Sequence, residues 1–241
     1  MMKNKSYIGI TFIILVFGII FVPKIINRLS NGTVVQNDRL NVKGGEKDSG
    51  LYTLGVAPKF TLINQDGVTV NQDFYKGKVY VLEFFFSTCP SICPIMNKNL
   101  VEVQKQFAGQ RDFGVASITI NPEYDTPAVL KNHKKELGIT SENWNFLTGD
   151  KDYIHKLSND GFKLFAGQNQ EAAGGFEHSG NYALIDKDGN IRCRVDETGN
   201  PIMYYSGLNY ADTDGMEEDP QGKYKPGVDA LKEDIKKLLD E

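Results

Sequence analysis

The sequence predicts one α/β domain that follows an N-terminal apolar segment. Three observations support this fold class: an uncharged apolar run at residues 7–22, strands that alternate with helices from about residue 57, and an amphipathic helix at the end. The 241 residues, 40% of them hydrophobic, can bury a sizeable core. With 27 basic and 31 acidic residues the net charge is −4, and no basic stripe marks the domain, so we expect no nucleic-acid partner.

The N-terminal run, YIGITFIILVFGIIFV, is preceded by two lysines and followed by Pro23-Lys24. We predict an uncleaved transmembrane anchor over residues 1–28, with a cleaved signal peptide as the alternative. A short N-terminal tail normally stays in the cytoplasm, so the domain is expected on the periplasmic or extracytoplasmic side, most naturally in a bacterium. Residues 29–56 are polar and glycine-rich and predict a flexible tether, which leaves residues 57–241 as the folded domain.

The domain is expected to open with a hairpin, because Phe60–Ile63 and Val68–Val70 flank the turn signal Asp66-Gly67. Lys78–Phe86 (KVYVLEFFF) is rich in β-branched and aromatic residues. Such a run is typical of a central strand that is buried on both faces.

A helix and a strand are expected next. Apolar residues recur at helical spacing over Ile92–Phe107, and Phe113–Ile120 is a second strand-like run. Thr126 followed by Pro127 is typical of a helix start, and Gly138 of a helix end, so a helix is predicted over residues 126–137.

The last elements complete an alternating pattern. Trp144–Leu147 predicts a short strand and Tyr153–Leu157 a short helix. Tyr182–Asp186 and Ile191–Val195 flank Asp188-Gly189 and predict a second hairpin. Residues 227–239 predict a terminal amphipathic helix. A βαβ unit followed by a β-hairpin and a last helix favours a thioredoxin-like fold.

Chemistry is expected where the central strand meets the first helix, because Cys89 and Cys93 lie four positions apart there. Positions i and i+4 share one face of a helical turn, and the positive helix N-terminus lowers the pKa of thiols. Thiol–disulfide exchange sites usually have two residues between their cysteines, whereas the three here still permit a disulfide and also leave room for a metal bridging both sulfurs. Two buried structural thiols are the plainer alternative. Cys193 alternates with arginines along a strand and is expected to be a core residue.

A third ligand is expected among the three histidines. His133 and His155 lie beside lysines in helical segments and are expected to be solvent-exposed. His178 lies in a glycine-rich loop just before a strand, where α/β folds often build sites. Two thiolates and one imidazole suit soft or borderline metals, copper first and zinc second.

Three motifs together resemble the Sco/SenC family of copper-binding, membrane-anchored, thioredoxin-like proteins. They are Thr88–Pro94 (TCPSICP), Asn121–Pro127 (NPEYDTP), and His178-Ser179 ahead of Tyr182–Gly189 (YALIDKDG). The similarity runs from about Ala57 to about Val195, with the anchor and the last helix in addition.

The resemblance implies that Cys89, Cys93 and His178 bind copper, as Cu(I) or Cu(II), and that Asp125 is an acid near the site. It also implies a copper chaperone that supports assembly of the dinuclear copper centre of cytochrome c oxidase. The implied partners are the copper-centre subunit of that oxidase or of another copper enzyme, thiol reductants, and the membrane. Asn121 departs from the aspartate usual in the family, and the connection at residues 196–226 is longer than expected.

Other functions remain open. A thiol–disulfide oxidoreductase could keep the copper-site cysteines of a partner reduced, but such enzymes carry a proline facing the cysteine pair, and the corresponding place near Ser179-Gly180 has none. A peroxidase would not need His178. We therefore expect metal binding and transfer, with redox activity of the Cys89–Cys93 pair, rather than enzymatic turnover.

Overall fold

The computed structural model describes residues 11, 15–17, 22–23, 50–172, 174–196, 198–208 and 227–241. The chain divides into two units, residues 1–43 and 44–241. In the first unit the described residues are helical, and Leu15 and Phe17 are exposed. Within the described part of the chain, no helix combines the length and apolar character needed to cross a bilayer. Most of the predicted anchor, residues 1–28, lies outside the described residues.

The second unit alternates strands and helices much as predicted. Its strands are β1 (Tyr52–Val56), β2 (Thr61–Asn64), β3 (Thr69–Asn71), β4 (Val79–Phe85), β5 (Phe113–Thr119), β6 (Trp144–Thr148), β7 (Ala166–Gln168), β8 (Phe176–His178), β9 (Asn181–Ile185), β10 (Asn190–Val195), β11 (Pro201–Ile202) and β12 (Tyr205–Ser206). Its helices are η1 (Gln72–Tyr75), α2 (Ile92–Gln106), α3 (Pro127–Glu136), α4 (Lys151–Lys156), η2 (Leu157–Phe162, a π-helix) and α5 (Gly227–Asp240).

The main sheet has the strand order β1-β10-β9-β4-β5-β6-β2-β3, with β11 and β12 added beside β10 and β9. The central pairs β4–β5 and β5–β6 are parallel, and the outer pairs are antiparallel. Every residue of β4 and β5 is buried. This burial on both faces explains why the sequence of β4 is a nearly continuous apolar run rather than an alternating one.

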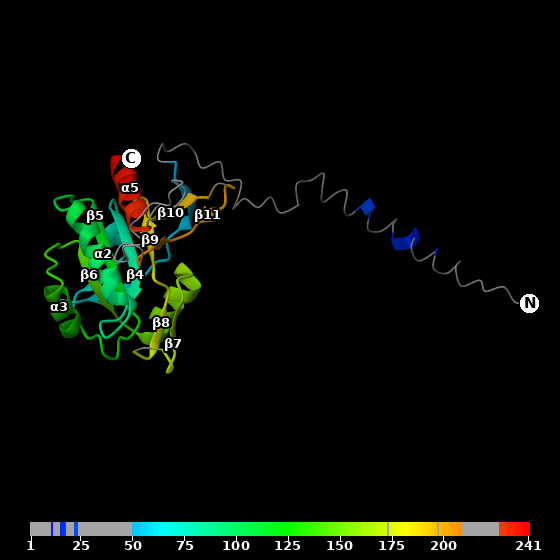
Figure 1. Ribbon diagram of the computed structural model, residues 1–241. Helices are drawn as coiled ribbons and strands as arrows, with labels where there is room; N and C mark the ends of the chain where they lie inside the picture. The colour runs from blue at the N-terminus through cyan, green and yellow to red at the C-terminus, as the bar shows by residue number, and fades with distance from the viewer. Residues whose placement is uncertain are drawn as a thin grey trace, which may run out of the picture. The chain divides into compact units, whose positions relative to one another are not determined.

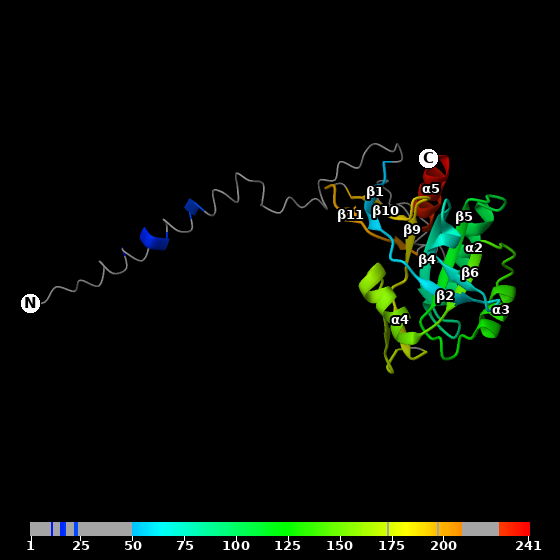
Figure 2. The same cartoon turned by 180° about the vertical axis from the view of Figure 1, so that it is seen from behind.

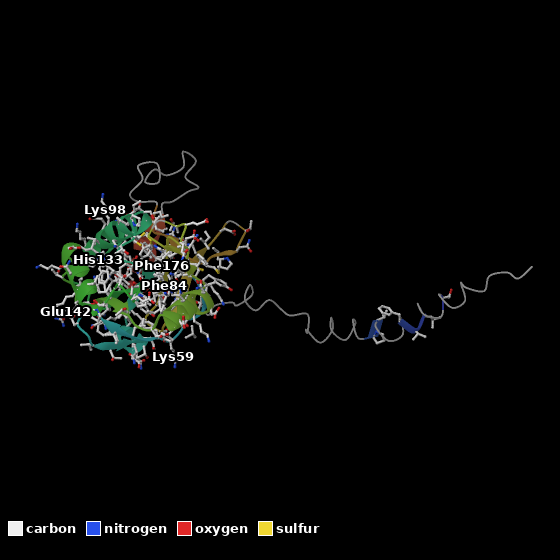
Figure 3. All side chains as sticks on the ribbon, turned by 90° about the horizontal axis from the view of Figure 1, so that it is seen from below. Lys59, Phe84, Lys98, His133, Glu142 and Phe176 are labelled. Carbon is white, nitrogen blue, oxygen red and sulfur yellow. The ribbon has the colours of Figure 1, made fainter. Side chains whose placement is uncertain are left out.

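Helices cover both faces of this sheet. In Figure 1, α2 lies in front of the central strands, and in Figure 2, seen from behind, α4 faces the viewer. Tyr182 of β9 donates a hydrogen bond to the Met96 carbonyl of α2 at 2.7 Å, while Phe84 of β4 packs on Phe162 of η2 at a ring distance of 6.0 Å. Figure 3 shows polar residues such as Lys98 and Glu142 at the rim of the domain. The core therefore lies on both sides of β4.

Three parts of the fold differ from the prediction. Residues 52–56, placed in the tether, form β1, which pairs with β10. The predicted glycine-rich loop around residue 178 is a hairpin of β7 and β8. Residues 201–202 and 205–206, inside the predicted connection 196–226, form β11 and β12. All of these strands are short, and hydrogen bonding to a neighbouring strand rather than local composition determines them.

The predicted start of α3 is confirmed, whereas α4 begins at Lys151, two residues before the predicted Tyr153. The Thr126 hydroxyl accepts a hydrogen bond from the Val129 backbone N–H, and Pro127 occupies the first turn of α3. At α4, the Asp150 carboxylate accepts from the Tyr153 N–H at 2.8 Å. Side-chain caps of this kind satisfy backbone donors that have no partner within the helix.

Candidate metal centre

The loop that follows β4 is held in place by a buried carboxylate. Asp125 is fully buried and accepts hydrogen bonds from the Ser87 backbone N–H at 3.1 Å and from the hydroxyls of Ser87 and Thr119. Thr119 ends β5, so Asp125 ties the loop to the neighbouring strand. Sequence reasoning placed Asp125 near the site only by resemblance. The sequence did not indicate that the hydroxyls of Ser87 and Thr119 bind this carboxylate, because serine and threonine are common in loops and at strand ends.

The two cysteines lie on either side of the start of α2. Cys93 is in the first turn of this helix, which begins at Ile92, whereas Cys89 precedes it. The predicted shared helical face is therefore wrong in detail, because a turn brings Cys89 back, with its backbone N–H bonded to the Phe86 carbonyl at 3.2 Å. Cys89 is 7% exposed and Cys93 2% exposed, and both are free thiols.

His178 reaches the cysteines from the β7–β8 hairpin. Its Nε2 lies 2.9 Å from Cys93 Sγ, and its Nδ1 lies 3.2 Å from the Ser179 carbonyl oxygen. A carbonyl only accepts hydrogen bonds, so the ring proton belongs on Nδ1, and the Nε2 lone pair faces the sulfur. This orientation leaves Nε2 able to bind a metal.

The hairpin is seated against the cysteine loop by close packing. The Phe86 ring contacts the rings of Phe176 and His178, at centroid distances of 5.5 and 5.9 Å. Gly174 adopts a φ of +84°, and a Cβ at this position would lie 2.8 Å from the Phe86 ring and 3.1 Å from Pro90 Cδ. Glycine is therefore required for both its backbone conformation and its lack of a side chain.

The interaction between the two sulfur groups moves their pKa values in opposite directions. Their mutual hydrogen bond is the main cause that lowers the pKa of Cys89, to about 3. The same hydrogen bond, and then burial, raises the pKa of Cys93. The pair thus presents a thiolate at Cys89 and a protonated thiol at Cys93, and the thiolate is the form that binds metals and attacks disulfides.

Cys89, Cys93 and His178 form a group able to hold a metal ion. One ligand atom from each lies within 4.8 Å of the others. Two sulfurs and an imidazole nitrogen fit copper, since thiolates favour Cu(I) and imidazole binds either oxidation state. The three residues that the sequence singled out are therefore brought together.

The other two histidines lie away from the cysteines. The prediction that both are solvent-exposed is wrong, because each is half-buried. His133 stacks on Phe85 at a ring distance of 5.6 Å and lies 3.1 Å from the Asn97 side chain, and burial lowers its pKa. His155 Nε2 lies 2.9 Å from the Ile120 carbonyl. The neighbouring lysines suggested exposure, but each histidine turns inward from its helix. Cys193 is fully buried, as predicted.

Comparisons with known proteins show the family of the chain. The sequence model described as SCO1/SenC matches residues 51–210. The chain belongs to the SCO1/SenC family. A SCO1 protein homolog of Bacillus subtilis (strain 168) is 30% identical over 150 residues, which cover 61% of this chain and 77% of that protein.

Solved SCO1/SenC structures share the fold. A SCO1/SenC family lipoprotein of Bacillus anthracis is 26% identical, with a TM-score of 0.60 over 77% of this chain and 95% of that one. BsSco, described as a member of the Sco family of cytochrome c oxidase assembly proteins, is 24% identical, with a TM-score of 0.60 over 78% and 96%. Copper-bound ScoI of Arabidopsis thaliana is 20% identical, with a TM-score of 0.55 over 77% and 99%.

Proposed function

We propose that this chain is a copper chaperone that binds copper through Cys89, Cys93 and His178. The observation that carries the proposal is the convergence of these three donor atoms within 4.8 Å, with His178 Nε2 against Cys93 Sγ. The copper-bound family member supports the choice of metal. Copper is here the cargo of the protein.

The site suits capture followed by release. The Cys89 thiolate offers the first bond to Cu(I), Cys93 gives up its proton to add the second sulfur, and His178 Nε2 supplies the nitrogen. Oxidation of the two copper-bound thiolates to a Cys89–Cys93 disulfide removes both sulfur ligands and passes two electrons to a disulfide of a partner protein, which takes up two protons from solvent and becomes a dithiol. Loading with copper therefore requires the reduced pair.

The recipient we propose is the dinuclear copper centre of cytochrome c oxidase, or a similar centre in another copper enzyme. The family resemblance and the description of BsSco as a cytochrome c oxidase assembly protein support this. We also propose that residues 1–28 anchor the chain and that residues 57–241, joined through residues 29–56, act on the extracytoplasmic side. The uncharged run at residues 7–22 and the lipoprotein nature of the Bacillus anthracis relative support membrane attachment.

A thiol–disulfide reductase that keeps a partner's copper ligands reduced is the second candidate. The low pKa of Cys89, about 3, favours it, because a thiolate at neutral pH is ready to attack a disulfide. This function needs Cys89 and Cys93 but makes no use of His178.

Titration of the reduced full-length chain in detergent with copper tests the first candidate. We expect one copper per chain, with Cu(II)–thiolate charge-transfer absorption that disappears in Cys89→Ser and Cys93→Ser. Absence of copper binding by the reduced parent chain would refute the chaperone function. Cells in which the Cys variants replace the parent should assemble less copper-loaded oxidase.

A further inference from the structure

Glu83 is a carboxyl group buried at the centre of the sheet. It is fully buried, on β4, in the sequence VYVLEFF. Its Oε1 accepts a hydrogen bond from the Ser117 hydroxyl at 2.7 Å, and the Ser117 oxygen accepts from Trp144 Nε1 at 2.9 Å. Its Oε2 is buried without a hydrogen-bond partner among the described residues. Burial of a half-satisfied carboxyl group costs free energy, and an apolar residue would fit this strand better.

Glu83 points to the side of the sheet on which the cysteines lie. Alternate residues of a strand share a face, so Glu83 and Phe85 point the same way. Phe85 packs on His133 of α3, whereas Phe84 packs on the opposite side against Phe162. The Asn97 side chain joins α2 to His133, so α2, which carries Cys93, covers the Glu83 face as well.

The titratable groups that face Glu83 come from three elements around it. Cys93 of α2, His178 of β8 and Tyr182 of β9 each interact electrostatically with the Glu83 carboxyl. Ser117 of β5 and Trp144 of β6 face it as neutral partners. Two of the three titratable neighbours, Cys93 and His178, are proposed copper ligands. Because the protein interior lies between them and Glu83, solvent screens their electrostatic interaction with the carboxyl group only weakly.

We propose that Glu83 is a buried negative charge behind the copper site that favours bound Cu(II) over bound Cu(I). This inference rests on the proposed function. Two thiolates and a neutral imidazole leave a Cu(I) complex with one negative charge and a Cu(II) complex neutral. A carboxylate inside the same low-dielectric region repels the first complex and not the second. In the described part of the chain, no hydrogen bond joins the Glu83 carboxyl to Cys89, Cys93 or His178, so Glu83 acts through the electric field that it adds.

The effect depends on pH. Burial raises the pKa of Glu83 to about 7, against the lowering effects of Ser117 and His178. The carboxyl group is therefore mostly neutral at pH 6 and mostly charged at pH 8. Cys93, His178 and Tyr182 are all retained in a Glu83→Gln variant, so the difference between the parent and this variant isolates Glu83.

The test compares Cu(I) and Cu(II) dissociation constants of the full-length chain in detergent, by competition with bicinchoninate and with glycine. At pH 8, Glu83→Gln should raise the preference for Cu(I) over Cu(II) by about tenfold, equivalent to about 59 mV for one electron. At pH 6 the difference should largely vanish. Glu83→Asp should keep the parent preference. Glu123→Gln removes a charge that is 73% exposed, and should change nothing.

The outcomes separate the inference from the proposed function. If the parent and Glu83→Gln bind copper and show the same preference for Cu(I) over Cu(II) at pH 8, the proposed role of Glu83 is wrong and the proposed function stands. Failure of the parent to bind copper would overturn both. If Glu83→Gln does not fold, Glu83→Leu supplies the neutral side chain, and the same shift in preference is expected.

Discussion

Cys93 Sγ and His178 Nε2 lie 2.9 Å apart, although 85 positions separate the two residues in the chain. The contact joins the first turn of α2 to a hairpin that lies outside the main sheet. The sulfur pair can therefore exist without the histidine, whereas the complete set of three donors requires the hairpin to be seated.

His178→Ala should separate metal binding from redox chemistry. Loss of the imidazole should weaken Cu(II) binding by about 3 kcal/mol, on the scale of metal-site energies, while the Cys89–Cys93 disulfide still forms and is reduced. Equilibrium copper competition and thiol counting measure the two properties. If oxidase assembly proceeds normally in cells with this variant, the reductase function is correct and the chaperone function is wrong.

Gly174→Ala should unseat the hairpin. The new Cβ would meet Phe86 and Pro90, and the positive φ would add backbone strain, so we expect a loss of about 2 kcal/mol in stability together with weaker copper binding. Gly175→Ala is the matched control, because its φ of +81° carries similar strain with no atom within 4 Å of the added Cβ. Equal copper affinities in the two variants would contradict the seating role of Gly174.

Cys193→Ala should leave copper stoichiometry at the parent value. Cys193 is fully buried, and burial raises the pKa of its thiol to about 12, so it stays protonated and unreactive. The cost should be about 1 kcal/mol of stability from the small cavity. Thermal unfolding and metal analysis check both numbers, and loss of a bound copper would mean that the site is misplaced.

A fragment of residues 51–241 should fold as a soluble monomer, whereas one of residues 57–241 should be less stable. The shorter fragment lacks β1 and leaves β10 as an edge strand. It also removes the Leu51 carbonyl, which accepts a hydrogen bond from Arg192 Nη2 at 3.2 Å. Denaturant unfolding and light scattering compare the two, and equal stability would show that β1 contributes little.

Glu83→Gln should stabilise the apo protein as the pH rises. The pKa of Glu83 is raised by burial from 4.5 to about 7, so the folded state holds this proton more tightly than the unfolded state. The parent therefore loses stability between about pH 4.5 and pH 7, up to about 3 kcal/mol, and the variant does not. Urea unfolding at pH 5 and pH 8 measures the difference, which should be larger at pH 8.

The strongly patterned parts of the fold could be predicted from the sequence. The apolar run of β4 and the cap of α3 carry their own signals, and both lie where expected. The strand β1 was not predicted, because its five residues follow a polar, glycine-rich segment, and their place in the sheet depends on pairing with β10. The predicted exposure of His133 and His155 was wrong for a similar reason, since neighbouring lysines do not show which face of a helix points toward the core.

The candidate site was easier to predict than its surroundings. Cys89, Cys93 and His178 stand out because their side chains are chemically unusual. Glu83 was visible as a charged residue in an apolar run, but only its lack of a second hydrogen bond makes it a candidate for function. The close packing of Gly174 against Phe86 and Pro90 joins segments that are distant in the sequence, so no local sequence pattern predicts it.

The strand order also determines when β1 can pair during folding. Strands β1 and β2 are neighbours in sequence but lie toward opposite edges of the main sheet, and Leu51 reaches Arg192 across 141 positions. A chain that emerges from its N-terminus must therefore hold β1 without a partner until β10 has been made. Pairing over such a separation is slow, and an unpaired strand can join other chains in the meantime. YTLGV carries no charge and no proline, so the sequence of β1 itself gives little protection against such pairing before β10 is made.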